Sequence, residues 1–159
     1  MYLLSIDPGC INSAYVLIDT DEERIIRKGI VPNKELLYNE FFHDIDKVVI
    51  EMVESYGMAV GAEIFETVFW IGRFFQRYQV LAQRGCEKVY RKDIKLHLCH
   101  SARAKDSNVR QALLDRFGKP GTKKKPNAFY NDALDKMRQD IWSALAVGVY
   151  YWDNINKYI

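Results

Sequence analysis

The chain has 159 residues, of which 48% are hydrophobic and 28% are charged, a balance typical of a globular domain and unlike that of a disordered segment. The 23 Lys and Arg residues against 21 Asp and Glu residues leave a net charge of only +2, so net charge alone does not indicate a nucleic-acid binder. Three separated cysteines without a CxxC pair argue against a disulfide scaffold or a zinc site, and no apolar stretch is long enough for a membrane span. We expect one soluble, cytoplasmic domain spanning 1–159.

The first part of the chain predicts strands. Apolar runs at 2–6, 14–18 and 23–31 are separated by short turn sequences, which favours an antiparallel meander. A short helix is expected within 34–46, followed by a buried strand at 47–50.

The second part of the chain alternates helices with a strand. We expect helices at 62–83, 91–98, 107–117 and 138–154, a strand at 86–90 and a lysine-rich loop at 119–131. Antiparallel strands followed by alternating strands and helices predict an α/β domain with a mixed sheet.

Three carboxylates stand at the ends of these elements. Asp7 follows the first strand, Glu51 follows the apolar run 48–50, and Asp140 opens the last helix. Such oxygen ligands on separate rigid elements suit Mg²⁺ or Mn²⁺. Each also has a structural interpretation: Asp7 as a turn residue, Glu51 as half of an ion pair, and Asp140 as a partner of the helix dipole.

Five motifs resemble those of the RuvC-type Holliday junction resolvases, of the RNase H-like and retroviral integrase superfamily. LSIDPG at 4–9 resembles the first motif, VIE at 49–51 the second, and DIWSALA at 140–146 the last. Between them, VYRKDIK at 89–95 and SARAKDS at 101–107 resemble the stretches that carry two functional lysines. The motifs occur in the family's order over nearly the whole chain.

The resemblance implies an RNase H-like fold, with a five-stranded mixed sheet of order 3-2-1-4-5 whose first three strands are antiparallel and helices on both faces. It implies that Asp7, Glu51 and Asp140 hold two Mg²⁺ ions, which Mn²⁺ could replace, and that Lys95 and Lys105 are catalytic. The implied activity is hydrolysis of branched DNA, a Holliday junction or other branch, leaving 5′-phosphate and 3′-hydroxyl ends. The short chain resembles phage or viral members, which would act in the cytoplasm of a bacterial host if the chain is phage-encoded.

One position departs from the family pattern. The last motif of the family has a second acidic ligand where this chain has Ser143, one helical turn after Asp140. A hydroxyl is a poorer ligand for a hard cation, so Ser143 and Asp135 are both candidates for the fourth ligand.

Basic charge concentrates in residues 103–125, which predicts contacts with DNA phosphates. A solvated charge run at 123–125 is the plainer interpretation. The predicted DNA-binding residues, including one aromatic that could stack on a base, are Arg103, Lys105, Arg110, Lys119, Lys123, Lys124, Lys125 and Tyr130.

The helix at 62–83 carries more apolar side chains than one buried stripe requires, with Phe65, Phe69, Trp70, Phe74 and Tyr78 in addition to the stripe. A second apolar face indicates a partner, and in the resembling family a helix at this position forms the homodimer interface. Complete burial of this helix within one core is the alternative.

Other functions fit fewer of these features. Actin-like and sugar-kinase ATPases also begin with a strand and a turn like 7–9, but they need two domains. A different RNase H-like nuclease, such as an RNase H or a general debranching nuclease, shares the carboxylates and stays open. A non-catalytic DNA-binding module would explain the basic segment but not the carboxylates at the strand ends.

Overall fold

The structure is a computed structural model that describes residues 1–40, 42–131 and 136–157. Its centre is a five-stranded sheet of order β3-β2-β1-β4-β5. The strands are β1 (Tyr2–Asp7), β2 (Asn12–Asp19), β3 (Arg24–Pro32), β4 (Lys47–Met52) and β5 (Cys86–Tyr90). The first three strands are antiparallel, whereas β1, β4 and β5 are parallel. The predicted strand order and directions are confirmed.

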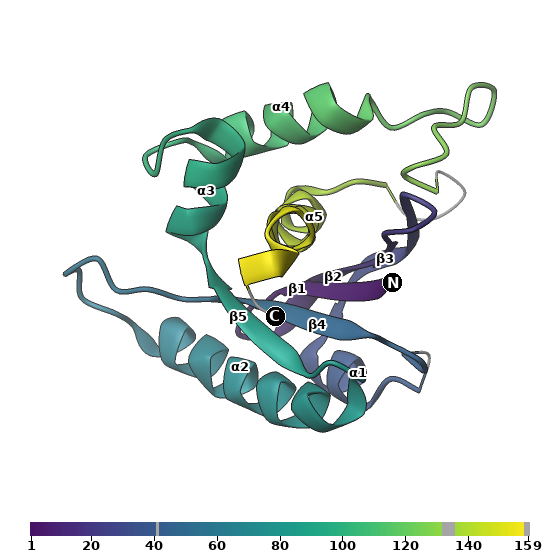
Figure 1. The fold of residues 1–159 in the computed structure, drawn as a ribbon. Coiled ribbons are helices and arrows are strands. Elements are labelled where there is room, and N and C mark those ends of the chain that lie inside the picture. Colours follow the sequence, from purple (N-terminus) through teal and green to yellow (C-terminus); the bar gives the residue numbers. More distant parts are fainter. Residues whose placement is uncertain (41, 132–135, 158–159) are drawn as a thin grey trace.

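Helices cover both faces of the sheet (Figure 1). On one face lie α1 (Asn33–Tyr38) and α2 (Ala62–Leu81). On the other, α5 (Gln139–Asp153) packs on the strands and α4 (Asp106–Phe117) lies outside it, with α3 (Arg91–Cys99) connecting β5 to α4. A 3₁₀ turn, η1 (Ile155–Lys157), follows α5.

Alternate residues of each strand lie on opposite faces of the sheet, because successive side chains of a strand point in opposite directions. In β1, Leu4 and Ile6 join the core under α1 and α2, whereas Leu3 joins the core under α4 and α5. In β4, Ile50 belongs to the α2 side and Val49 to the α5 side. The residues that follow Ile6 and Ile50 therefore point toward α5, which places Asp7 and Glu51 on the α5 face of the sheet.

Helix α5 is the central helix of the molecule because it is apolar around its circumference. All residues from Ile141 to Tyr151 are buried between the sheet and α4. None of the helices described has the combination of length and apolarity that crossing a bilayer requires.

The far end of α5 is tied to α3 and α4 by one carboxylate. Asp153 accepts hydrogen bonds from Nη1 of Arg116 at 2.7 Å and from the ring of His97 at 2.8 Å. Burial raises the pKa of Asp153, but these hydrogen bonds and charges outweigh burial and leave the pKa below its usual value. This contact closes the helical layer at the end opposite to Asp140.

Candidate active site

Asp7 ends β1 on a loop that buried polar groups hold in place. The hydroxyl of Ser13 donates to Oδ1 of Asn33 at 2.6 Å, and the Asn33 amide donates to the Gly9 carbonyl at 2.8 Å. A Cβ on Gly9 would lie 2.3 Å from the Asn12 carbonyl oxygen, so this turn requires glycine. The Asp-Pro-Gly sequence thus forms a tight, fixed turn that holds Asp7 at the edge of the sheet.

Glu51 reaches the same edge from the neighbouring strand. Because β1 and β4 are parallel and Ile6 pairs with Ile50, Asp7 and Glu51 occupy adjacent positions at the carboxyl ends of their strands. Strand β5 runs parallel to β4, and Arg91 follows its last residue at this edge.

The last helix brings the third carboxylate. Asp140 lies in the first turn of α5, and Ser143 follows one turn later and is buried. The negative charge of Asp140 acts on Asp7, which places both in one electrostatic cluster. Asp7 and Glu51 therefore meet at one sheet edge, and Asp140 on α5 is exposed but near enough for its charge to act on Asp7.

The ionised form of Asp7 is unfavourable in this cluster. Burial, followed by the charge of Glu51, raises the pKa of Asp7 to about 8, and Asp140 and Asp106 add to this effect while Arg91 opposes it. Burial also raises the pKa of Glu51, although Arg91 again acts in the opposite direction. The site thus gathers negative charge that needs a cation.

The donor chemistry of these residues fits a hard divalent cation. The ionised form of a buried carboxylate is unfavourable on its own and becomes stable when a metal ion binds it in place of water. Within the described residues, however, no three His, Cys, Asp or Glu side chains already lie at metal-binding spacing. The alternative ligand Asp135 lies outside the described residues.

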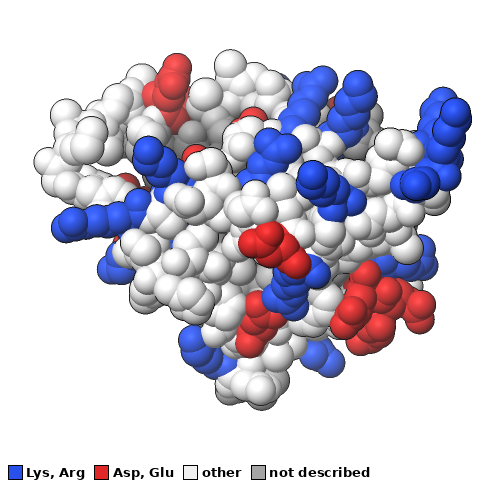
Figure 2. Space-filling model, turned by 90° about the horizontal axis from the view of Figure 1, so that it is seen from above, with Lys and Arg blue, Asp and Glu red and all other residues white. Residues whose placement is uncertain are grey.

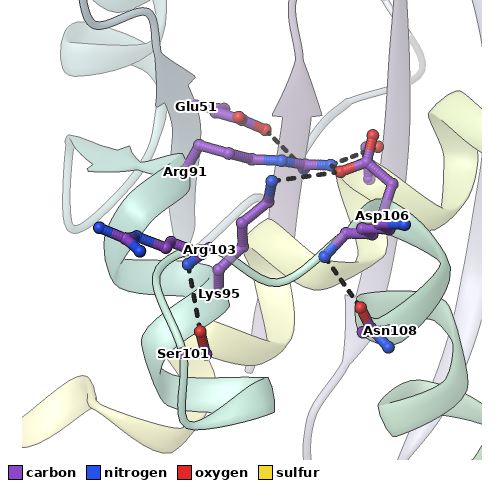
Figure 3. Close-up of polar contacts among 9 residues, drawn as sticks. Glu51, Arg91, Lys95, Ser101, Arg103, Asp106 and Asn108 are labelled. Atoms are coloured by element: carbon purple, nitrogen blue, oxygen red, sulfur yellow. Dashed lines mark hydrogen bonds and ion pairs between the residues drawn. The ribbon is translucent and has the colours of Figure 1, made fainter. Parts of the chain in front are cut away.

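A guanidinium lies among these carboxylates, which sequence reasoning did not predict as a site residue. Arg91 donates to Oε2 of Glu51 at 3.3 Å and to Oδ1 of Asp106 at 2.6 Å (Figure 3). Its Nη2 also lies 3.4 Å from Oγ of Ser143. The ion pair weighed for Glu51 therefore exists. The sequence signal for it was a basic residue directly after a strand that ends beside Glu51.

Two of the predicted lysines border this cluster. The Nζ of Lys95 on α3 lies 3.7 Å from Oδ1 of Asp106, and the charge of Lys95 acts on Glu51. Lys105 precedes α4 and is exposed, and its backbone N–H donates to Oδ1 of Asn108 at 2.9 Å. The structure therefore pairs Lys95 with Asp106, near enough to Glu51 for its charge to act there, and leaves the side chain of Lys105 at the surface.

Sequence comparison yields neither a matching protein-family model nor a matching curated protein. Solved structures do match. The structure of RuvC from Thermus thermophilus aligns with a TM-score of 0.67 and 16% identity, covering 97% of this chain and 96% of that one. The chain has a RuvC-like fold.

Two further structures have the same fold. T. thermophilus RuvC in complex with a Holliday junction substrate aligns with a TM-score of 0.66 and 14% identity, over 99% of this chain and 96% of that one. The Fowlpox virus resolvase in a complex with Holliday junction DNA aligns with a TM-score of 0.55 and 16% identity, over 98% and 99% of the two chains. At these identities the likeness concerns the fold.

Basic side chains lie on the α3–α4 side of this RuvC-like fold. Figure 2 looks down on that side and shows Lys and Arg side chains spread over the face, with acidic atoms visible in a hollow between them. The predicted DNA-binding residues exposed in this region are Arg103, Lys105, Arg110, Lys119, Lys123, Lys124 and Lys125. Arg110 also lies over the ring of Trp142, 5.4 Å from its centroid, which limits the freedom of its side chain.

Tyr130 does not fit its predicted role of stacking on a base. It is 0% exposed, its hydroxyl donates to the Gly118 carbonyl at 2.7 Å, and its ring packs edge-on against Trp142. Phe129 is buried beside it and stacks on Phe117 with 3.8 Å between ring centroids. The prediction was wrong because these aromatic residues of the loop close the core under α4 rather than face solvent.

Helix α2 has the second apolar face that its sequence indicated. Ile71, Phe74 and Tyr78 are buried against the sheet, whereas Phe65 and Phe69 are 64% and 60% exposed. The alternative of a helix enclosed within one core is therefore wrong. Phe74 and Tyr78, counted as part of the surplus from sequence, belong to the buried stripe.

Proposed function

We propose that this chain is a metal-dependent endonuclease that cuts Holliday junctions or other branched DNA, in one domain spanning 1–159 and in the cytoplasm. The observation that carries the proposal is the pair of carboxylates Asp7 and Glu51 at one sheet edge of a RuvC-like fold, with Asp140 near enough for its charge to act on Asp7. The fold alone would also suit a binding protein. Two largely buried carboxylates beside a basic face do not suit a protein that only binds phosphates, because they repel phosphates unless they hold a cation.

Magnesium, or manganese in its place, would be held by Asp7, Glu51 and Asp140. When bound there, such an ion polarises a phosphodiester and lowers the pKa of water, so that hydrolysis yields a 5′-phosphate and a 3′-hydroxyl. The carboxylates on β1 and β4 would fix the position of the ion, because both strands belong to the centre of the sheet.

The lysines and arginines of the α3–α4 side would hold the DNA. Lys95 lies beside the carboxylates and can neutralise negative charge that develops on the phosphate. Lys105 is exposed at the start of α4 and can reach the phosphate from the solvent side. The lysines at 123–125 are exposed on the loop after α4, where they can follow a neighbouring arm of the junction.

We also propose a homodimer through α2. Phe65 and Phe69 are exposed, and Phe69 lines a groove of about 590 Å³ together with α1 and α2 residues such as Leu37, Val68 and Gly72. This surface lies on the opposite side of the sheet from α4, so a twofold partner would leave the basic face open. Two sites related by a twofold axis suit paired cuts in a four-way junction. Sedimentation of the wild type and of Phe69→Glu tests this arrangement.

The experiment that tests the function is cleavage of a synthetic four-way junction in Mg²⁺, compared with duplex DNA and an RNA–DNA hybrid of matched sequence. We expect cutting of the junction and analysis of the product ends to show a 5′-phosphate. Asp7→Asn should abolish cutting and retain junction binding. Asp44→Asn is the matched control: Asp44 is exposed, precedes β4 at the opposite edge and has a φ of 60°, which asparagine adopts readily. Preferred cutting of the RNA–DNA hybrid would instead identify an RNase H, and full activity of Asp7→Asn would show that Asp7 is not a metal ligand.

A further inference from the structure

Arg91 occupies the space between Glu51 and Ser143, the residue at the position of the family's last acidic ligand. Its guanidinium lies between Glu51, at 3.3 Å, and Ser143, whose Oγ is 3.4 Å away. The charge of Arg91 also acts on Asp7. A positive charge is thus already present on the side of the cluster that faces Ser143.

Arg91 is anchored there from the outside. Its Nη2 donates to Asp106 at 2.6 Å, and Asp106 also pairs with Lys95 at 3.7 Å (Figure 3). The side chain of Arg91 is 21% exposed, so it is packed rather than free in solvent. Burial raises the pKa of Asp106, but the hydrogen bond and charge of Arg91, together with Lys95, outweigh burial and lower it. Asp106 therefore stays ionised and keeps Arg91 directed toward the carboxylates.

Ser143 stands at the position where the family pattern has an acidic ligand, so a second ion would lack that ligand. It lies on the same face of α5 as Asp140, one turn further on, and is 7% exposed. Its hydroxyl is a weak ligand for a hard cation and is in contact with Arg91. A second divalent ion at this position would have a neutral ligand on one side and a fixed guanidinium on the other, which repels it.

Among the residues that the structure describes, the charges of the site balance with one ion. Asp7, Glu51 and Asp140 supply three negative charges, which one divalent ion and one guanidinium neutralise. Asp106 and Lys95 neutralise each other at the rim. If a second divalent ion took the place of the guanidinium, the positive charge would exceed the three negative charges, because Ser143 contributes no negative charge.

We propose that this site takes one divalent cation and that Arg91 supplies the positive charge that a second cation would otherwise provide. The proposal rests on the proposed function, since it assumes that Asp7, Glu51 and Asp140 hold a metal ion. It revises the count of two ions that the sequence resemblance implies. Arg91 would contact a non-bridging oxygen of the scissile phosphate, and Asp106 is the positioning residue that holds it in place.

The experiment counts bound ions in the full-length chain. Mn²⁺ is titrated into metal-free protein, with calorimetry for the stoichiometry and electron paramagnetic resonance for the spectrum. Two Mn²⁺ ions about 4 Å apart are spin-coupled and are distinguished from one isolated ion. The variants are Ser143→Asp, Arg91→Ala and the double variant, with Arg91→Lys as a matched control that keeps the charge. Circular dichroism confirms that each variant is folded.

We expect one Mn²⁺ per chain in the wild type and in Arg91→Lys, and two coupled ions in the double variant. The rate of junction cleavage by the wild type should depend on Mg²⁺ with a Hill slope near 1. Two coupled ions in the wild type, or a slope near 2, would overturn the proposal and leave the nuclease assignment intact. A double variant that still binds one ion would show that Arg91 and Ser143 do not set the count. If the chain neither binds Mn²⁺ nor cleaves the junction, the proposed function itself is contradicted.

Discussion

The crowding of carboxylates around Asp7 has a measurable cost in the metal-free protein, and Asp7→Asn should remove it. Burial and the charge of Glu51 raise the pKa of Asp7 from 3.8 to about 8 in the folded state. At 1.36 kcal/mol per pKa unit, this shift destabilises the folded state by about 4 kcal/mol at pH 7. A buried amide in place of the carboxylate costs about 1–3 kcal/mol in unmet hydrogen bonds. The net gain in the free energy of unfolding should be about 1–3 kcal/mol.

The sign of the effect fixes its pH dependence. An acid whose folded pKa is raised destabilises the protein only where the unfolded state is ionised, so the cost is absent below pH 3.8 and grows up to about pH 8. The Asp7→Asn protein should therefore be less stable than the wild type near pH 4, where the cost of the buried amide dominates, and more stable than the wild type near pH 8. In a chain of this size the gain corresponds to a rise in melting temperature of about 3–9 °C.

Urea denaturation in EDTA, at pH 5 and at pH 8, measures this difference. Adding Mg²⁺ at about 100 times its dissociation constant should then stabilise the wild type by about 2.7 kcal/mol and leave Asp7→Asn unchanged. Asp106→Asn is the matched control, because its pKa is lowered by Arg91 and Lys95, and its loss should destabilise rather than stabilise. An Asp7→Asn protein that is less stable than the wild type at pH 8 would refute the idea of a crowded, cation-seeking cluster.

Other substitutions separate the structural from the functional residues. Asp153→Asn should lower the free energy of unfolding by about 1–3 kcal/mol at pH 7, as measured by urea denaturation. Because the pKa of Asp153 is lowered in the folded state, this difference should disappear as the pH falls below about 4, and a difference that stays constant with pH would contradict the prediction. Tyr130→Phe should cost about 1 kcal/mol of stability through the lost bond to Gly118 while junction affinity stays unchanged; weaker binding at full stability would restore a DNA-contacting role. Replacing the lysines at 123–125 by alanine should make junction affinity less dependent on salt, by an amount that corresponds to at most about three phosphate contacts, and should leave the cleavage rate at saturation unchanged. An unaltered dependence of affinity on salt would show that these lysines are a solvated charge run. Lys105→Ala should slow cleavage of bound junction about 100-fold with little loss of affinity, and an equal rate at saturating junction would exclude it from catalysis.

Much of the fold was predictable because its signals are local. The strands β1 and β4 are short apolar runs, and α5 is the longest apolar stretch in the second half of the chain. The resemblance then supplied the strand order, which the pairings confirm. Residues at the ends of parallel strands meet at one sheet edge, so Asp7 and Glu51 were predictable neighbours once the order was known.

The positions of Arg91 and Tyr130 were not predictable in the same way. Arg91 stands in a charged run, and only the parallel pairing of β4 with β5 shows that it starts beside Glu51. Tyr130 follows a loop of polar composition, and its burial depends on the carbonyl of Gly118 and the ring of Trp142, which lie far from it in sequence or on another element. In both cases a tertiary contact decides between two roles that one side chain could have.

The position of α5 connects the packing of the core with the chemistry of the site. A Cβ on Gly148 would lie 2.8 Å from Cδ1 of Ile18 and 2.9 Å from Oγ of Ser5, so glycine allows α5 to lie close against β1 and β2. Ser5 precedes Asp7 by two residues on the same face of β1, and its hydroxyl donates to the Val16 carbonyl at 3.2 Å. Since this contact fixes α5 against the strand that carries Asp7, the repulsion between Asp7 and Asp140 cannot relax through movement of the helix. The close packing that stabilises the fold therefore also maintains the need of the site for a cation.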